Sequence, residues 1–362
     1  MKTRIWVTGQ GVVSGLGLNV YRHCQVASKT LPAVSPIDVA GLPLLPIDRR
    51  FSVNEFVKSS SLRRRQRLSL LVMAAMHDAW TDAGLNVATT ANLDEMGVIV
   101  STEYGPQRTV SEYLDKFIGG GMEHASPSLF TQTVYNAAAG QGSIFLKTRG
   151  VNSTLVGASA VAYAMRLLRA GDAEAILACG VDETNDIMTA RLRTIYCAAR
   201  LTSFILGEAA GALILETSDS CRLRKARPHA ELLSFSSMSA GTAGLEYTQW
   251  PDDEPALEQA VRRALDDSAL TMKDIDLIVA PANGFPGVDQ SEKTCLDRLG
   301  WSGPIIRPRL IAGECFGGNE PLAYVLGLSC AEPKQVILII VVTVSGDITA
   351  TVVRKEFAHD NH

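Results

Sequence analysis

Residues 150–169, GVNSTLVGASAVAYAMRLLR, decide the fold of this chain. The stretch begins with a short apolar, β-branched run, continues through a turn of small residues and ends in a helical pattern. We expect a strand, a turn and a helix, with Ser159 in the turn. Unpaired backbone N–H groups converge where a strand end meets a helix N-terminus, and they favour a reactive or anion-binding atom there. Ser159 is therefore the first candidate functional residue.

The composition indicates a compact globular protein. The chain has 362 residues, of which 46% are hydrophobic and 20% charged, and its net charge is -4. This charge gives no general attraction to nucleic acid or to an anionic membrane. The longest apolar run, residues 336–342, is far shorter than the roughly 20 residues that span a bilayer. We expect neither nucleic acid nor a membrane as a partner.

The seven cysteines are scattered along the chain. They form no CxxC pair and no Cys/His cluster at metal-ligand spacing, so we expect neither a disulfide framework nor a metal site. A reducing compartment is the simplest environment for such a chain. We therefore expect a cytoplasmic protein.

The second half of the sequence repeats the first. DAGL followed by DEMGVIVSTEYG has its counterpart in DSAL followed by DIDLIVAPANG. Residues 155–180 likewise match residues 311–341, each with a strand, a glycine turn, a helix and an apolar strand. Continuous apolar strands that alternate with helices indicate an α/β fold with helices on both sheet faces. We expect two halves, 1–217 and 218–362, whose strand-end turns converge between them.

Two further segments leave alternatives open. Residues 9–17, GQGVVSGLG, follow a short predicted strand at 5–8 and read as a tight glycine-rich turn, because their spacing fits neither nucleotide-binding motif. Residues 59–67, SSSLRRRQR, place four arginines at or before a helix start. These arginines indicate either a solvated face or a docking patch for an acidic partner.

Several separated motifs together resemble one family. RIWVTGQGVVSGLG at the start, GEAAG at residues 207–211 and the GVNSTLVGASA segment are similar to the thiolase-fold β-ketoacyl-acyl-carrier-protein synthases. The motifs match in order over nearly the whole chain. The resemblance implies a thiolase-like fold, with internally duplicated α/β halves in a layered α-β-α-β-α structure, and it implies no cofactor.

The catalytic motifs of that family are altered here. Active members carry a nucleophilic cysteine in a pattern like STACASG, and two histidines in motifs like EAHGTGT and K-x-x-x-G-H-x-x-G. In this chain Ser159 replaces the cysteine, Asn283 and Glu314 replace the histidines, and Arg309 replaces the lysine. The family's GFGG loop is replaced by residues 344–347. No catalytic residue of the family is therefore intact.

These substitutions remove the chemistry that the family uses. A serine hydroxyl needs an adjacent general base, and we expect none beside Ser159. An ionised Glu314 would repel a developing oxyanion, whereas Asn283 could still donate a hydrogen bond. The chain on its own is therefore not expected to be an enzyme.

The resemblance implies a specific kind of subunit. The family contains chain-length factors of type II polyketide systems, which have lost the nucleophile and pair with an active ketosynthase. By that analogy the chain is a non-catalytic subunit that forms a heterodimer with a ketosynthase and shapes its acyl tunnel. The complex would elongate a polyketide, a polyene or a fatty-acid-like chain. An aryl polyene system is one candidate for the pathway. The alternatives are a Ser159-dependent acyltransferase or hydrolase, and a malonyl-carrier decarboxylase.

The same analogy implies which residues line the acyl tunnel, form the subunit interface and bind the carrier protein. The tunnel or gate candidates are Tyr104, Val110, Tyr113 and Phe117. Tyr113 and Phe117 lie four positions apart on a predicted helix, so they could equally belong to the core. The interface candidates are Thr131, Thr133, Asn136, Asn152 and Thr154. An acyl carrier protein would dock on the arginine segment, at Arg63, Arg64, Arg65 and Arg67.

Overall fold

The computed structural model describes residues 3–32, 34–48, 51, 65–85, 92–240 and 253–356. Ten strands form one sheet in the order β11-β10-β12-β13-β9-β1-β8-β6-β4-β5. The first half of the chain supplies β1 (Ile5–Ser14), β4 (Met96–Thr102), β5 (Asn152–Val156), β6 (Ala175–Asp182) and β8 (Ala209–Thr217). The second half supplies β9 (Ala230–Ser239), β10 (Leu277–Val279), β11 (Ile305–Ile306), β12 (Val336–Val342) and β13 (Asp347–Lys355).

The two sets of strands are joined where β1 pairs with β9. Both sets run in an equivalent order outward from this junction, as the sequence repeat predicts. A small separate sheet contains β2 (Ile37–Val39), β3 (Leu42–Leu45) and β7 (Leu206–Gly207).

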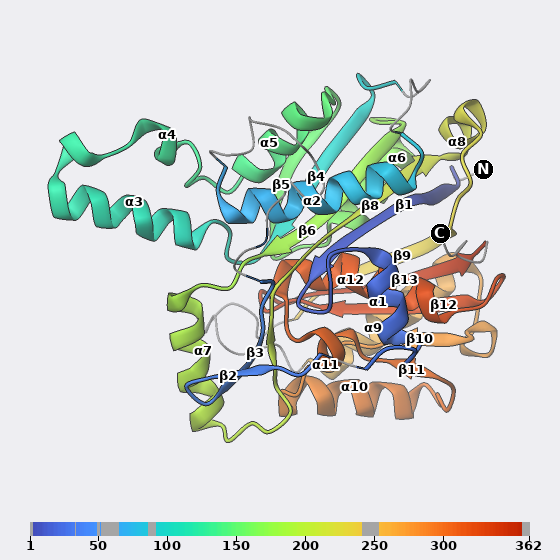
Figure 1. Cartoon of the computed structure of the whole chain (residues 1–362). Coiled ribbons are helices and arrows are strands. Elements are labelled where there is room, and N and C mark those ends of the chain that lie inside the picture. Colours follow the sequence, from blue (N-terminus) through green and yellow to red (C-terminus); the bar gives the residue numbers. More distant parts are fainter. Residues whose placement is uncertain are drawn as a thin grey trace.

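The helices cover the strands in layers (Figure 1). Helices α2 (Arg67–Asp82) and α5 (Ala137–Leu146) pack on the outer face of the first half, and α9 (Glu254–Ser268) and α10 (Pro286–Arg298) pack on the second. Helices α6 (Ala160–Ala170) and α12 (Asn319–Cys330) share a core with strands of both halves. This arrangement confirms the layered thiolase-like fold.

The described chain has further helices and turns. They are α1 (Val20–Ala27), α3 (Gln107–Gly120), α4 (Pro127–Phe130), α7 (Asp186–Ala198), α8 (Ser218–Arg224) and α11 (Pro308–Ala312), with 3₁₀ turns η3 (Met122–His124), η4 (Met272–Asp274) and η5 (Phe316–Gly318). Within the described ranges, no helix combines the length and the apolarity needed to cross a membrane.

The predicted glycine-rich turn after the first strand is wrong over residues 9–14. Strand β1 continues to Ser14 and includes Gly9 and Gly11. A Cβ atom on Gly11 would collide with the backbone carbonyl of Ala75, and one on Gly9 with that of Ala79. Both carbonyls belong to α2, so these glycines allow the helix backbone to pack directly on the strand. The glycines thus reflect a close approach and not a turn.

Helices α3 and α4 with turn η3 form an arm that extends from the body (Figure 1). Helix α3 buries only Thr109. The ring of Tyr113 lies 6.5 Å from that of Phe117 and 5.5 Å from that of Phe130, between centroids. Phe117 is nevertheless 41% exposed. Phe117 therefore does not belong to a buried core of the described chain, whereas the half-buried Tyr113 packs against the aromatic rings of the arm.

Candidate functional site

Ser159 lies at the predicted junction of strand and helix. It is the N-cap of α6, and its Oγ accepts a hydrogen bond from Ala162 N at 2.9 Å. The same hydroxyl donates to Oε1 of Glu320, which comes from the first turn of α12. The other carboxylate oxygen of Glu320 accepts from Ala160 N at 2.9 Å and Val161 N at 3.4 Å. A glutamate from the second half thus binds the N-terminus of a helix in the first half.

This contact corrects the expectation that Ser159 has no base beside it. Burial raises the pKa of Glu320 to about 7, although the hydrogen bond from Ser159 acts in the opposite direction. In its ionised form this carboxylate accepts the hydrogen bond of the Ser159 hydroxyl, which is the position of a general base. Glu320 escaped the sequence prediction because an acidic residue in the first turn of a helix is common and stabilises any helix dipole.

The space beside Ser159 is almost filled. The cavity there measures about 10 Å³, which is the volume that a single water molecule needs. The loop that replaces the family's GFGG motif and the residue before it cover this space: Thr343 Oγ1 donates to Gly157 O at 3.4 Å, and Ser345 Oγ donates to Glu103 Oε2. A Cβ atom on Gly157 would collide with Ser345. In this structure an acyl chain has no room at Ser159.

The three other altered catalytic positions meet in one buried cluster. Asn283 Nδ2 donates to Glu314 Oε2 at 2.8 Å, and Arg309 Nη1 donates to the same oxygen at 3.2 Å. Glu314 Oε1 accepts from Phe316 N at 3.1 Å and from Asn319 Nδ2. All three replaced side chains are buried.

Two expectations about this cluster need correction. The charge of Glu314 faces Arg309, so it is compensated and not directed at a reacting atom. The amide N–H of Asn283 that we expected to serve a substrate donates to Glu314 instead. The polar side chains of this cluster form hydrogen bonds with one another, and none of them is oriented to stabilise an oxyanion.

Further buried carboxyl groups surround the site at the ends of β4 and β6. Asp182 accepts from Thr102 Oγ1 at 2.7 Å and from the backbone N–H groups of Glu103 and Gly317, each at 2.8 Å. Burial raises the pKa of Asp182 to about 6 and that of Glu103 to about 8. Burial also raises the pKa of the Cys315 thiol well above its usual value, so this nearby cysteine is a poor nucleophile.

The predicted tunnel and interface residues occupy different places. Tyr104 lies at the site, where its ring packs edge-on against Phe316 at 4.8 Å between centroids. Val110, Tyr113 and Phe117 lie on α3, which belongs to the arm (Figure 1).

The predicted interface residues lie on or near the α4–α5 connection and β5. Thr131, Thr133 and Asn136 connect α4 and α5, and of these Thr131 and Asn136 are exposed. Asn152 and Thr154 are on β5, which pairs only with β4 among the described strands and forms one edge of the sheet. Asn152 Nδ2 donates to Ser143 Oγ at 2.6 Å and so ties β5 to α5.

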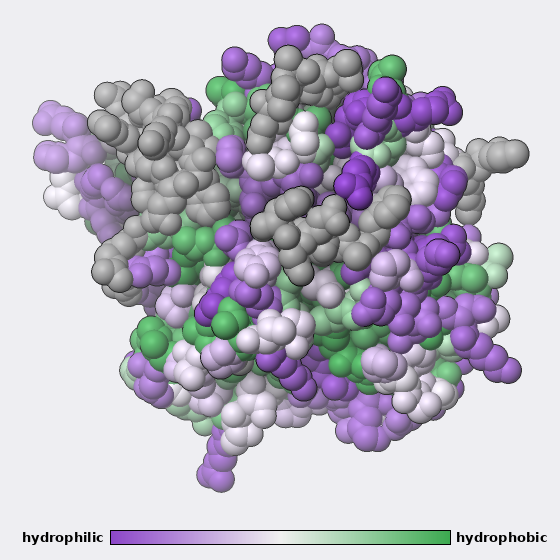
Figure 2. Space-filling model, turned by 45° about the vertical axis from the view of Figure 1, so that its right-hand side comes forward, coloured by the Kyte–Doolittle hydropathy of each residue, from purple (hydrophilic) through white to green (hydrophobic). Residues whose placement is uncertain are grey.

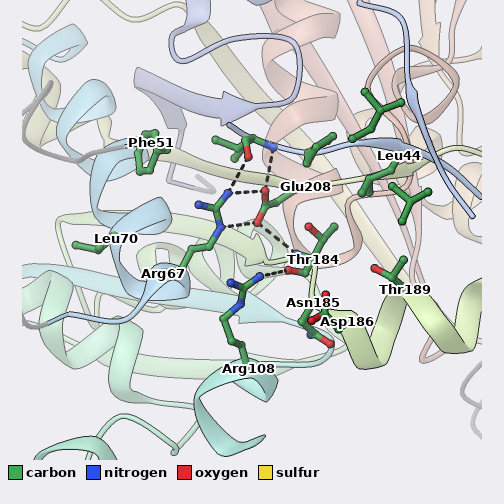
Figure 3. Close-up of a pocket in the computed structure, with 14 residues that line it drawn as sticks. Leu44, Phe51, Arg67, Leu70, Arg108, Thr184, Asn185, Asp186, Thr189 and Glu208 are labelled. Carbon is green, nitrogen blue, oxygen red and sulfur yellow. Dashed lines mark hydrogen bonds and ion pairs between the residues drawn. The ribbon is translucent and has the colours of Figure 1, made fainter. Parts of the chain in front are cut away.

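A second cavity, of about 370 Å³, lies between the small sheet, α2 and the start of α7 (Figure 3). Here Arg67 Nε and Nη2 donate to the two carboxylate oxygens of Glu208 at 2.9 and 2.7 Å. The side chain of Arg67 is only 16% exposed. The prediction that Arg67 serves as a docking residue is therefore wrong, because a buried bidentate pair holds its head group. Arg65 is half-buried, and Arg63 and Arg64 lie outside the described residues.

The buried carboxyl groups predict an unusual pH dependence of stability. Burial raises the pKa values of Glu103, Asp182 and Glu320, so the folded chain holds their protons to higher pH than the unfolded chain does. Between roughly pH 4 and pH 8 the unfolded state binds fewer protons, and the free energy of unfolding therefore falls as the pH rises. One unit of pKa shift corresponds to about 1.4 kcal/mol.

We expect the Tm to fall from roughly pH 5 to roughly pH 8 in a thermal unfolding series. Glu103→Gln removes one of these groups and should flatten the slope, whereas Glu95→Gln, at an exposed position, should leave it unchanged. A Tm that rises over this window, or equal slopes in the two variants, would contradict the assignment.

Residues 44–220 match the family of the β-ketoacyl synthase N-terminal domain. A 3-oxoacyl-acyl-carrier-protein synthase 2 of Staphylococcus aureus (strain COL) is 24% identical, over 80% of this chain and 75% of the relative. The corresponding enzyme of Coxiella burnetii is also 24% identical, over 82% of this chain and 77% of its own length.

Solved structures share the fold. The ishigamide ketosynthase/chain length factor superimposes with a TM-score of 0.84 at 18% identity, covering 99% of this chain and 100% of that one. A ketosynthase in complex with its chain length factor from Xenorhabdus doucetiae gives a TM-score of 0.76 at 15% identity, with 98% of each chain covered. A type II polyketide acyl-carrier protein in complex with its ketosynthase gives a TM-score of 0.83 at 18% identity, covering 98% of this chain and 100% of that one.

Proposed function

Since this chain is a ketosynthase-family protein that resembles a chain length factor, we propose that it is the non-catalytic subunit of a heterodimer with an active ketosynthase. In that complex it shapes the acyl tunnel of the partner during elongation of a polyketide, polyene or fatty-acid-like chain. The observation that carries the proposal is the closed Ser159 site, with its cavity of about 10 Å³.

The replaced catalytic residues support this role. Each of them now bonds to another residue of the chain: Ser159 to Glu320, and both Asn283 and Arg309 to Glu314. The same contact of Asn283 argues against a malonyl-carrier decarboxylase, in which its N–H would be needed for the substrate. What the chain retains is therefore its fold and its surfaces.

The edge of the sheet at β5 supports a protein partner. The strand sequence NSTLV contains no charge and no proline, which are the usual means of protecting an exposed edge from pairing. Val156 at its end is 54% exposed. The adjacent arm and α5 add further exposed apolar side chains, namely Leu114, Phe117, Ile118, Met122, Phe130, Val134, Tyr135 and Ile144.

The other exposed large apolar side chains of the described chain are scattered over separate elements, namely Tyr21, Ile37, Ile187, Leu223 and Leu310. The face drawn in Figure 2 shows mostly hydrophilic residues, with hydrophobic ones scattered in small groups. A concentration of apolar residues around β5 and the arm is typical of a surface that another protein covers. The structures of a ketosynthase with its chain length factor are precedents for such a complex.

We place the tunnel contact on the arm. Val110, Tyr113 and Phe117 lie on α3, and in the heterodimer they would reach the partner's acyl chain, where bulky side chains limit its length because overpacking an apolar slot costs about 1–3 kcal/mol. Tyr104 would complete the lining near the site. An acyl carrier protein would approach through Arg63, Arg64 and Arg65. All seven cysteines are free thiols, which supports a cytoplasmic location.

One observation favours a second candidate function. The hydrogen bond from Ser159 to Glu320 supplies a base, so a Ser159-dependent acyltransferase or hydrolase has a plausible proton acceptor. The small cavity opposes this candidate, since an acyl donor must enter before the serine can react. The two candidates differ in whether Ser159 ever carries an acyl group.

The first prediction tests the interface. Val156→Lys places a charge on the β5 edge and should abolish 1:1 co-purification with the co-expressed cognate ketosynthase, because a lysine opposes strand pairing. The matched control is Ile187→Lys on α7, where the side chain is similarly exposed at 57%. Loss of the complex in both variants, or in neither, would argue against this interface.

The second prediction tests the absence of catalysis by this subunit. Ser159→Ala should leave elongation by the assembled complex largely intact. Intact-mass spectrometry after incubation with an acyl-carrier donor should detect no adduct on the wild-type chain. An adduct that disappears in Ser159→Ala, or loss of turnover while the heterodimer still assembles, would instead support the acyltransferase.

The third prediction tests the tunnel contact. Tyr113→Ala removes a large ring from α3 and should shift the product distribution of the complex toward longer chains, measured by mass spectrometry of released products. Tyr21→Ala on α1 is the control, because Tyr21 is exposed on a different helix. Unchanged product length in Tyr113→Ala, with the complex intact, would rule out a gate at this position.

A further inference from the structure

We propose that the cavity of about 370 Å³ between the small sheet, α2 and α7 binds an amphipathic carboxylic acid, whose carboxylate is recognised by Arg108. A cavity of this volume lies within the range of about 300–1,000 Å³ that is usual for small-molecule sites. It is separate from the filled space beside Ser159, because the two spaces share no lining residue. The inference does not depend on the proposed function.

The polar part of the lining contains an arginine with spare hydrogen-bonding capacity. Arg108 lies in the first turn of α3, and its side chain is 47% exposed. Among the described residues it forms one hydrogen bond, from Nη2 to the carbonyl oxygen of Thr184 at 2.9 Å (Figure 3). A guanidinium group has several further N–H donors in a planar fork that matches a carboxylate. These donors are available to a ligand, and Thr184 and Thr189 add hydroxyl groups to the lining.

A buried carboxyl group beside Arg108 provides an independent observation. Glu183 is 2% exposed, and neither of its carboxylate oxygens accepts a hydrogen bond from a described residue. Its Oε2 lies 3.8 Å from Nε of Arg108, which is too far for a hydrogen bond. Burial raises the pKa of Glu183 to about 7, although the charge of Arg108 acts in the opposite direction. The chain thus pairs Arg108 only loosely, and a carboxylate ligand would complete its hydrogen bonding.

The other charged groups of the lining favour an anion no less. Arg67 and Glu208 neutralise each other in their bidentate pair. Asp186 is exposed, so water and salt screen its charge. Arg108 is therefore the group that sets the charge preference of the cavity.

The rest of the lining is largely aliphatic. It includes Ile37 and Val39 on β2, Leu44 on β3 and Leu70 on α2. Ile37 is 54% exposed although its side chain is large and apolar. A ligand that covers such side chains with an apolar body removes their surface from water, which favours binding. The ligand that fits both parts of the lining has an anionic head and an apolar body.

Binding of decanoate to the full chain tests the proposal. Calorimetric titration is made at roughly pH 8, where the Glu183 carboxyl group, whose pKa is about 7, is ionised. Decanoate should bind about tenfold more tightly than decanol, which has the same chain length but no charge. Acetate, which lacks the apolar body, should also bind more weakly than decanoate.

The arginine variants locate the binding. Arg108→Gln should weaken decanoate binding about tenfold, because hydrogen bonds from a charged group are lost. Arg191→Gln, at an exposed position of α7 outside the lining, is the matched control and should bind decanoate as the wild type does. Equal affinities of the wild type for decanoate and decanol, or unchanged decanoate binding in Arg108→Gln, would overturn the proposal.

A second variant covers the case in which Arg108→Gln does not fold. Glu183→Gln preserves the size of the side chain but removes the negative charge beside Arg108. It should strengthen decanoate binding and leave decanol binding unchanged, since the uncompensated guanidinium attracts only the anion. The other charged groups that act on Glu183, namely Arg67, Asp182 and Glu208, are unaltered in this variant. Unchanged or weaker decanoate binding in Glu183→Gln would also overturn the proposal.

Discussion

The interaction between Glu320 and the first turn of α6 connects the centre of the protein. Helices α6 and α12 are equivalent elements of the duplicated halves, and they lie in the layer between the two sets of strands. A buried carboxylate is unfavourable unless its oxygens receive hydrogen bonds, and here all of the donors come from the other helix. The relative position of the two helices is therefore fixed by polar contacts as well as by packing.

The same physical principle governs the neighbouring cluster around Glu314. Its oxygens receive hydrogen bonds from Asn283, Arg309, Asn319 and a backbone amide, so its burial is compensated. A catalytic centre differs in that it keeps preorganised donors available for charge that develops on the substrate. In this chain the polar groups at the same place are used to satisfy each other. The result is a stable interior in which the donors needed for reaction are already occupied.

The sequence was sufficient to predict the fold but only part of the site. Continuous apolar strands and an internal repeat predict the duplicated layers correctly, because both depend on local patterns that repeat along the chain. The role of Gly11 was misread, since its reason is the approach of α2 from a distant part of the sequence. Glu320 was missed and the role of Arg67 was misjudged for the same reason. Their partners, Ser159 and Glu208, lie far away in sequence, and no local signal marks such pairs.

The packing of helix α3 and the exposed sheet edge at β5 bear on whether the chain works alone. Helix α3 buries only Thr109 within the chain, and a helix of this length is marginally stable in water without tertiary packing. Its apolar side chains and the uncharged edge of β5 would be liabilities in a protein that worked alone. The carboxylates of Glu314 and Glu320, by contrast, are buried and receive hydrogen bonds from groups of the same chain. Because α3 contributes only Thr109 to the described core, a partner that covered the arm in the proposed heterodimer would complete the packing of this helix.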